Sequence, residues 1–191
     1  MQKIILLIII FLSQGTMSWG QSDTLSYESI VSFYNNKTST IDFFQQSGNN
    51  DKASELTEER DGYIDALGDS YGKGLFFLIL SKEYYDSGDY LNAIKECSKT
   101  VEIYKKILGI NHPEYVWSLE SLANFYSETG NYLESIRFSS EARERGKIVF
   151  GNNHPYYAAF LNNLADDYSH LGNYFEAIRL GTEAQEIYKQ I

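Results

Sequence analysis

The chain has 191 residues, which is the length of one ordinary domain or of a short array of repeats. Its 26 acidic and 16 basic side chains give a formal net charge of −10, which argues against binding to nucleic acid, because phosphate recognition requires clustered Lys and Arg. The single cysteine excludes an internal disulfide and a cysteine-based zinc cage. Composition alone therefore indicates an acidic globular chain and no particular activity.

The first 20 residues have the pattern of a secretory signal peptide. Lys3 is the only charged side chain among them, and Ile4–Leu12 is an uninterrupted apolar run. A transmembrane helix needs about 20 apolar residues, so this short run favours a cleaved signal over the alternative, an uncleaved membrane anchor. We expect cleavage near Gly20 and export, to the periplasm or the medium if the source is bacterial. We expect no stable insertion into a membrane afterwards.

A period of 42 residues governs the rest of the chain. Gly88, Gly130 and Gly172 are separated by this step, and a tyrosine follows each of them by two residues. The same step relates further sets of identical residues, namely Leu80, Leu122 and Leu164; Tyr84, Tyr126 and Tyr168; and the pairs His112-Pro113 and His154-Pro155. So many identities at one fixed offset indicate that a single structural unit is repeated.

Each unit has the pattern of two helices joined by a tight turn. One apolar stripe of an α-helix, with positions i, i+3, i+4 and i+7, is formed by Leu119, Leu122, Ala123 and Tyr126. The glycine that follows predicts the end of this helix, because glycine adopts the left-handed backbone conformation readily. The His-Pro pair predicts the start of the next unit, since proline fits the first turn of a helix. The pattern predicts an all-α solenoid of antiparallel helix pairs, with Cys97 buried and inert.

These patterns divide the chain after the signal peptide into two parts. Residues 21–70 contain two helical segments without the tyrosine signature, and they form either a degenerate repeat or an N-terminal capping hairpin. Residues 71–191 form three repeats, at about 71–112, 113–154 and 155–191. The last repeat ends in an apolar helix without a polar capping helix. We therefore expect either a fragment of a longer chain, which is the favoured interpretation, or self-association through this helix.

The repeat resembles a known family. The order Leu-Ala-x-x-Tyr-x-x-x-Gly-x-Tyr, followed by a small residue and Ile, resembles the tetratricopeptide repeat. The long period and the segments Leu108–Pro113 and Phe150–Pro155 are similar to the kinesin-light-chain type of this repeat. The resemblance implies a right-handed superhelix in which the first helix of each pair lines a concave, peptide-binding groove. It assigns to this groove Lys82, Tyr85, Trp117, Glu120, Asn124, Ser127, Asn162, Asn163 and Asp166.

The resemblance also suggests roles for individual groove residues. Asn124 and Asn163 match positions at which the family uses amides to hold a peptide backbone, a task that suits a group with both a donor and an acceptor. Trp117 is either an aromatic anchor for the partner or part of the packing within the array. Because Lys82 is the only basic residue among carboxylates and amides, the groove favours a polar or basic peptide over an acidic one.

We find no arrangement of residues that indicates catalysis or metal binding. His112 and His154 occupy the same turn position in successive repeats, so they lie too far apart to share one ion. His170 is close in sequence to Asp166 and Asp167, but two further ligands are missing. No serine or cysteine has an identifiable His–Asp relay, and a His-Glu-x-x-His motif is absent. We expect no enzymatic activity, no cofactor and no metal.

The sequence therefore predicts a non-catalytic scaffold that binds a partner protein or peptide in its groove. The alternative is a sensory or regulatory arm of a larger signalling or peptidase protein, because repeats of this type are commonly joined to such domains.

Overall fold

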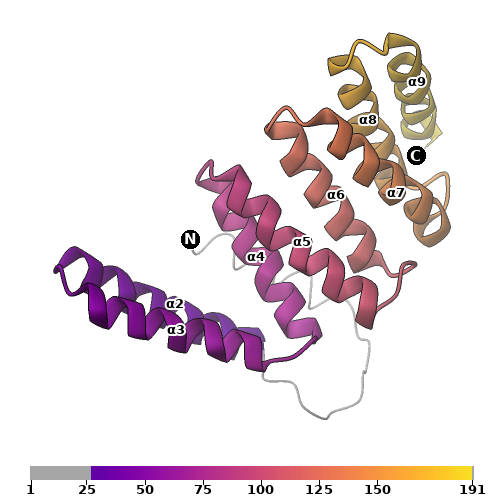
Figure 1. Ribbon diagram of the computed structural model, residues 1–191. Helices are drawn as coiled ribbons and strands as arrows, with labels where there is room; N and C mark the ends of the chain where they lie inside the picture. Colours follow the sequence, from indigo (N-terminus) through magenta and orange to yellow (C-terminus); the bar gives the residue numbers. More distant parts are fainter. Residues whose placement is uncertain (1–26, 191) are drawn as a thin grey trace.

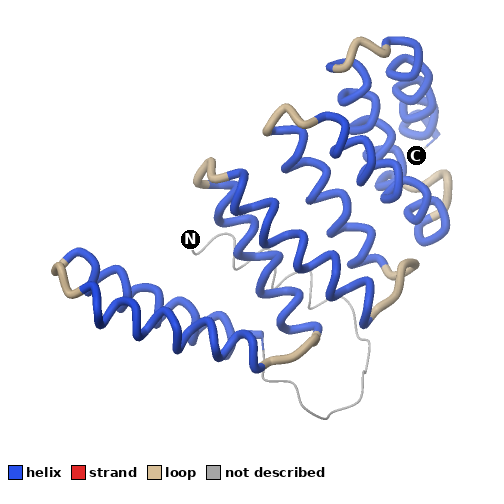
Figure 2. The backbone as a smooth tube through the Cα atoms, viewed as in Figure 1, coloured by secondary structure: helices blue, strands red, loops and turns tan. Residues whose placement is uncertain are grey.

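The computed structural model of the chain describes residues 27–190, so the predicted signal peptide of residues 1–20 lies outside the described part. The described chain consists of helices connected by short turns (Figure 2). Its eight helices are α2 (Tyr27–Gln46), α3 (Asn50–Ala66), α4 (Tyr71–Asp86), α5 (Tyr90–Ile107), α6 (Pro113–Glu128), α7 (Tyr132–Phe150), α8 (Pro155–His170) and α9 (Tyr174–Gln190). Within residues 27–190, no helix is both long and apolar enough to cross a membrane.

The helices form antiparallel hairpins that stack side by side (Figure 1). The pairs are α2–α3, α4–α5, α6–α7 and α8–α9, and consecutive pairs meet where α5 packs against α6 and α7 packs against α8. This arrangement confirms the predicted all-α solenoid of antiparallel helix pairs.

The turn inside each hairpin explains why the same spacing of glycine and tyrosine recurs in each repeat. Gly130 has φ of 76°, in the left-handed region that glycine adopts without strain, and its N–H donates to the carbonyl of Ser127 at 2.9 Å. Asn131, the next residue, caps α7 by accepting a hydrogen bond from the backbone N–H of Glu134. Three residues therefore end one helix and begin the next.

The His-Pro pairs cap the first helix of their repeats. The Nδ1 atoms of His112 and His154 accept hydrogen bonds from the backbone N–H groups of Glu114 and Tyr156, at 3.2 and 3.1 Å. The following proline occupies the first turn of α6 or α8, where its missing N–H has no helical partner to lose. Both histidines therefore have a structural role.

The core lies between the two helices of each pair and between neighbouring pairs. Leu119, Leu122 and Leu164 are each about 1% exposed, as their apolar stripe predicts. Cys97 is fully buried, its Sγ donates to the carbonyl of Ser118, and burial raises the pKa of its thiol to about 12. The thiol is therefore protonated and unreactive, in line with the expectation from the sequence.

The hairpin α2–α3 joins the array through α2, which contacts α4. Ile30 and Ile64 belong to the main core, whereas Ile41 and Leu56 belong to a small separate cluster further along the hairpin. Figure 1 shows that α2 and α3 diverge from α4 and α5. Residues 27–66 thus form a hairpin whose packing differs from that of the three regular pairs.

The last helix exposes an apolar face. Ile178 is 69% exposed and Tyr174 is 64% exposed. The residues at the same positions of the earlier repeats are half-buried, namely Ile94 and Ile136 for Ile178 and Tyr90 and Tyr132 for Tyr174. No described residue covers this part of α9. Self-association through this helix stays a prediction.

We predict that Gly146→Ala destabilises the fold by about 1–3 kcal/mol, because overpacking a filled core costs this much. Gly146 lies in α7, and a Cβ atom there would be 2.6 Å from a ring carbon of the fully buried Phe160. Gly181→Ala in α9 is the matched control. No atom lies within 4 Å of its Cβ position, so this change is expected to stabilise by about 0.5–1 kcal/mol. Urea unfolding followed by circular dichroism measures both, and equal effects would contradict the packing described.

Candidate functional site

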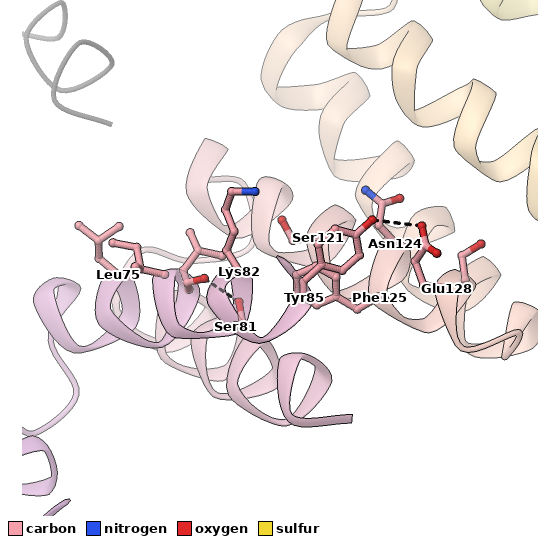
Figure 3. Close-up of a pocket in the computed structure, with 11 residues that line it drawn as sticks. Leu75, Ser81, Lys82, Tyr85, Ser121, Asn124, Phe125 and Glu128 are labelled. Carbon is pink, nitrogen blue, oxygen red and sulfur yellow. Dashed lines mark hydrogen bonds between the residues drawn. The ribbon is translucent and has the colours of Figure 1, made fainter. Parts of the chain in front are cut away.

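The helices α4, α6 and α8 adjoin on one side of the array, called the inner face below. An open groove of about 500 Å³ lies on this face between α4 and α6 (Figure 3). Its lining residues are Leu75, Leu78, Ile79, Ser81, Lys82, Tyr85, Ser121, Asn124, Phe125, Ser127 and Glu128. The groove brings together four of the residues predicted from the sequence: Lys82, Tyr85, Asn124 and Ser127.

Tyr85 connects the two walls of the groove. Its ring stacks on Phe125 with the centroids 5.0 Å apart, and its hydroxyl donates to Oε1 of Glu128 at 3.1 Å. Figure 3 shows this hydrogen bond reaching from α4 to α6. Two further polar side chains are accessible, since Lys82 and Asn124 are exposed and Lys82 makes a 3.5 Å ion pair with Asp86. The groove therefore combines a fixed aromatic and aliphatic lining with polar groups that a partner can reach.

A second polar cluster lies between α6 and α8. The Nδ2 atom of Asn163 donates to Oε1 of Glu120 at 2.5 Å and to Oδ1 of Asn124 at 3.4 Å. Glu120 is only 4% exposed, and its other oxygen, Oε2, is buried without a hydrogen-bond partner. Burial raises the pKa of Glu120 to about 8, which outweighs the opposing effect of the Asn163 hydrogen bond. The structure thus brings together the predicted residues Glu120, Asn124 and Asn163. The amide hydrogens of Asn163 are used for hydrogen bonds within the chain, to Glu120 and Asn124.

The sequence pattern does not single out Asp167, which is the buried member of the adjacent pair Asp166 and Asp167. Its carboxylate accepts hydrogen bonds from Ser127 at 2.7 Å and from Ser135, so it connects α8 with both α6 and α7. Burial is the main cause that raises its pKa. The 42-residue period does not identify it either, because the same column holds the exposed Glu83, the buried Phe125 and Asp167. A buried acidic residue requires internal partners.

Trp117 belongs to the packing between repeats. Its half-buried ring lies 4.5 Å from Tyr156, 5.4 Å from Phe160 and 5.9 Å from Phe150, measured between ring centroids. Three aromatic rings from α7 and α8 thus surround the side chain. This placement agrees with the packing alternative, and a role as aromatic anchor stays a prediction.

The remaining predicted residues are the exposed Asn162 and Asp166 on α8. Ser127 lines the groove, but its hydroxyl donates to Asp167. The nine residues therefore fall into an accessible set and a set that is committed to internal contacts. The accessible set is Lys82, Asn124, Asn162 and Asp166.

The residues 68–72 read Gly-Asp-Ser-Tyr-Gly, a spacing that also occurs around the nucleophilic serine of α/β-hydrolases. That motif requires a strand-to-helix turn, whereas this segment connects α3 and α4. Ser70 instead caps α4, because its Oγ accepts a hydrogen bond from the backbone N–H of Lys73.

His170 stacks on Tyr132 with centroids 4.6 Å apart. Among the described residues, no group of three or more His, Cys, Asp or Glu could hold a metal ion.

Comparisons with known proteins agree with this architecture. Residues 84–132 and 116–190 match the tetratricopeptide repeat family. A protein of Podospora anserina described as a kinesin light chain with nearly identical TPR-like repeats superposes with a TM-score of 0.65 at 20% identity, over 88% of this chain and 78% of that one. BtubC (BKLC) from P. vanneervenii superposes with a TM-score of 0.63 at 13% identity, over 89% of this chain and 67% of that one. No curated protein sequence matches the chain.

We predict that Glu120→Gln removes part of the pH dependence of stability. The pKa of Glu120 is about 8 in the folded chain against an ordinary 4.5, so the folded state binds this proton more tightly than the unfolded state. The free energy of unfolding therefore falls as pH rises from 4.5 to 8, by up to about 1.4 kcal/mol per pH unit. Glutamine is neutral throughout, so the variant keeps only the fall contributed by the other carboxyls whose pKa is raised, which are Glu83, Glu114 and Asp167.

Urea unfolding at a series of pH values measures this difference. Glu186→Gln, at an exposed position of α9, is the control and should follow the wild-type profile. If the free energy of unfolding of Glu120→Gln fell with pH as steeply as that of the wild type, the Glu120 carboxyl would not be the cause of this pH dependence.

Proposed function

Because the chain belongs to the tetratricopeptide repeat family, we propose that it is a non-catalytic scaffold that binds an extended segment of a partner protein in the groove between α4 and α6. Tetratricopeptide repeats generally serve as protein-interaction scaffolds. The observation that carries the proposal is the open groove of about 500 Å³, which combines an apolar lining with accessible polar groups. This combination suits a peptide, whose side chains are partly apolar and whose backbone needs hydrogen bonds.

The rigidity of the groove supports binding. Tyr85 is held by stacking on Phe125 and by its hydrogen bond to Glu128, so the two walls are connected before a partner arrives. A preformed site lowers the entropy that binding costs on the scaffold side, and the partner segment then contributes most of the ordering. Asn124 is accessible on the α6 side. Its Oδ1 accepts from Asn163 at 3.4 Å, which leaves its Nδ2 to donate to a peptide backbone.

We predict that Lys82→Ala combined with Asn124→Ala weakens peptide binding about tenfold, the effect of losing about 1.4 kcal/mol of contacts. Both side chains are exposed, so the fold should be unchanged. Lys105→Ala combined with Asn152→Ala is the matched control, since these residues are exposed on α5 and in the turn before α8. A peptide array identifies ligands of the wild-type chain, and fluorescence anisotropy then measures all three proteins. If the groove variant and the control variant bound the peptides with equal affinity, the peptides would not bind in this groove.

We also propose that the chain works after export, on the basis of the apolar run Ile4–Leu12 and the single charge of Lys3 before it. Expression of the full chain in a bacterium should give a periplasmic species that begins at Gln21. N-terminal sequencing of the fractionated protein measures this. A species that retains residues 1–20 in the membrane or cytoplasmic fraction would contradict the proposal.

A further inference from the structure

Charge differs sharply between the neighbouring helices α5 to α8. The inner helices α6 and α8 carry five carboxylates and no Lys or Arg; the carboxylates are Glu114, Glu120, Glu128, Asp166 and Asp167. The neighbouring helices α5 and α7 carry eight basic residues against five acidic ones. A partner that approaches the inner face over α6 and α8 therefore meets only negative formal charge from these two helices, and charge complementarity favours a cationic segment there.

The hydrogen bonds of the cluster between α6 and α8 leave acceptors without donors. Asn163 uses its Nδ2 atom for Glu120 and Asn124, and both oxygens of Asp167 accept from serine hydroxyls. Oε2 of Glu120 then remains unpartnered although the side chain is 96% buried. When Glu120 is ionised, this oxygen is a buried acceptor without a donor, which disfavours the ionised form. A cationic donor is the group that stabilises the ionised form most strongly.

From these two observations we infer that the inner face over α6 and α8 is a binding site for an Arg or Lys side chain of the partner segment, with Glu120 as its counter-charge. The inference rests on the proposed function, because the same partner would continue from the groove between α4 and α6. The basic side chain takes the place of Asn163 beside Glu120 and donates to both carboxylate oxygens, including Oε2. Asp166 lies exposed on α8, the helix that carries Asn163, as a second carboxylate.

Binding of the basic side chain is coupled to the loss of one proton from Glu120. Free Glu120 holds its proton near neutral pH, because burial raises its pKa and Asp167 on α8 is the charged group that raises it further. On binding, the carboxyl releases this proton to the solvent and forms an ion pair with the guanidinium or ammonium group. The amide of Asn163 becomes free to donate to a carbonyl of the partner backbone. Binding should therefore strengthen as pH rises from about 6 to about 8.5, while Arg and Lys stay charged.

A short synthetic peptide of alternating Ser and Arg, with both ends blocked and a fluorescent label, tests the inference against the full chain. Fluorescence anisotropy at low salt should detect binding, and a peptide of alternating Ser and Gln should bind at least about tenfold more weakly. Glu120→Gln should weaken binding of the Arg peptide about tenfold and remove its pH dependence. Glu186→Gln removes the same formal charge from an exposed position of α9 and should change affinity less than about twofold.

Two results would overturn the inference. Equal weakening by Glu120→Gln and Glu186→Gln would show that only the net charge attracts the peptide, and equal affinity for the Arg and Gln peptides would show that no cation is recognised. Neither result affects the proposed groove function. That function is tested separately, by the dependence of array-selected peptides on Lys82 and Asn124.

Discussion

Stacking of helix pairs is the constraint on which the rest of this structure depends. A single hairpin of two helices cannot bury its apolar stripes alone, so each pair must be covered by the next. The small residues at repeated positions make this cover possible: Ala93, Ser135 and Ala142 are at most 1% exposed where helices pack together. In the same way, Gly146 lets the ring of Phe160 approach the backbone of α7. The period of 42 residues therefore arises because each helix pair needs the same residues at the same packing positions.

The same stacking determines where the inner face is open. Between α6 and α8 the helices touch, and the contact is filled by Glu120, Asn163 and Asp167 with their hydrogen-bond partners. Between α4 and α6 a groove of about 500 Å³ remains, bridged by Tyr85 and Glu128. Both features arise from side chains on one face of each first helix. The array thus offers a partner an apolar recess next to an acidic, hydrogen-bonded surface.

The regular part of the fold could be predicted because its signals are local. Helix ends at glycine, caps at His-Pro and apolar stripes at helical spacing each depend on residues that are neighbours in the sequence. Contacts between helices could not be predicted in the same way. The period places Asn124 and Asn163 on inner helices, but it does not show that Asn163 donates to Glu120. Nor does it show that the half-buried Trp117 contacts three rings from other helices.

Asp167 illustrates why buried polar residues are the hardest to interpret from one sequence. Its column holds the exposed Glu83 in one repeat, the buried Phe125 in the next and Asp167 in the last. The two serine hydroxyls make the buried carboxylate tolerable. Replacing such groups by apolar residues is often neutral or stabilising in other proteins. Asp167 and Glu120 hold α6, α7 and α8 together through directional bonds, whereas apolar contacts tolerate sliding. Directional bonds fix the spacing of the inner helices, and that spacing determines which side chains a bound segment can reach.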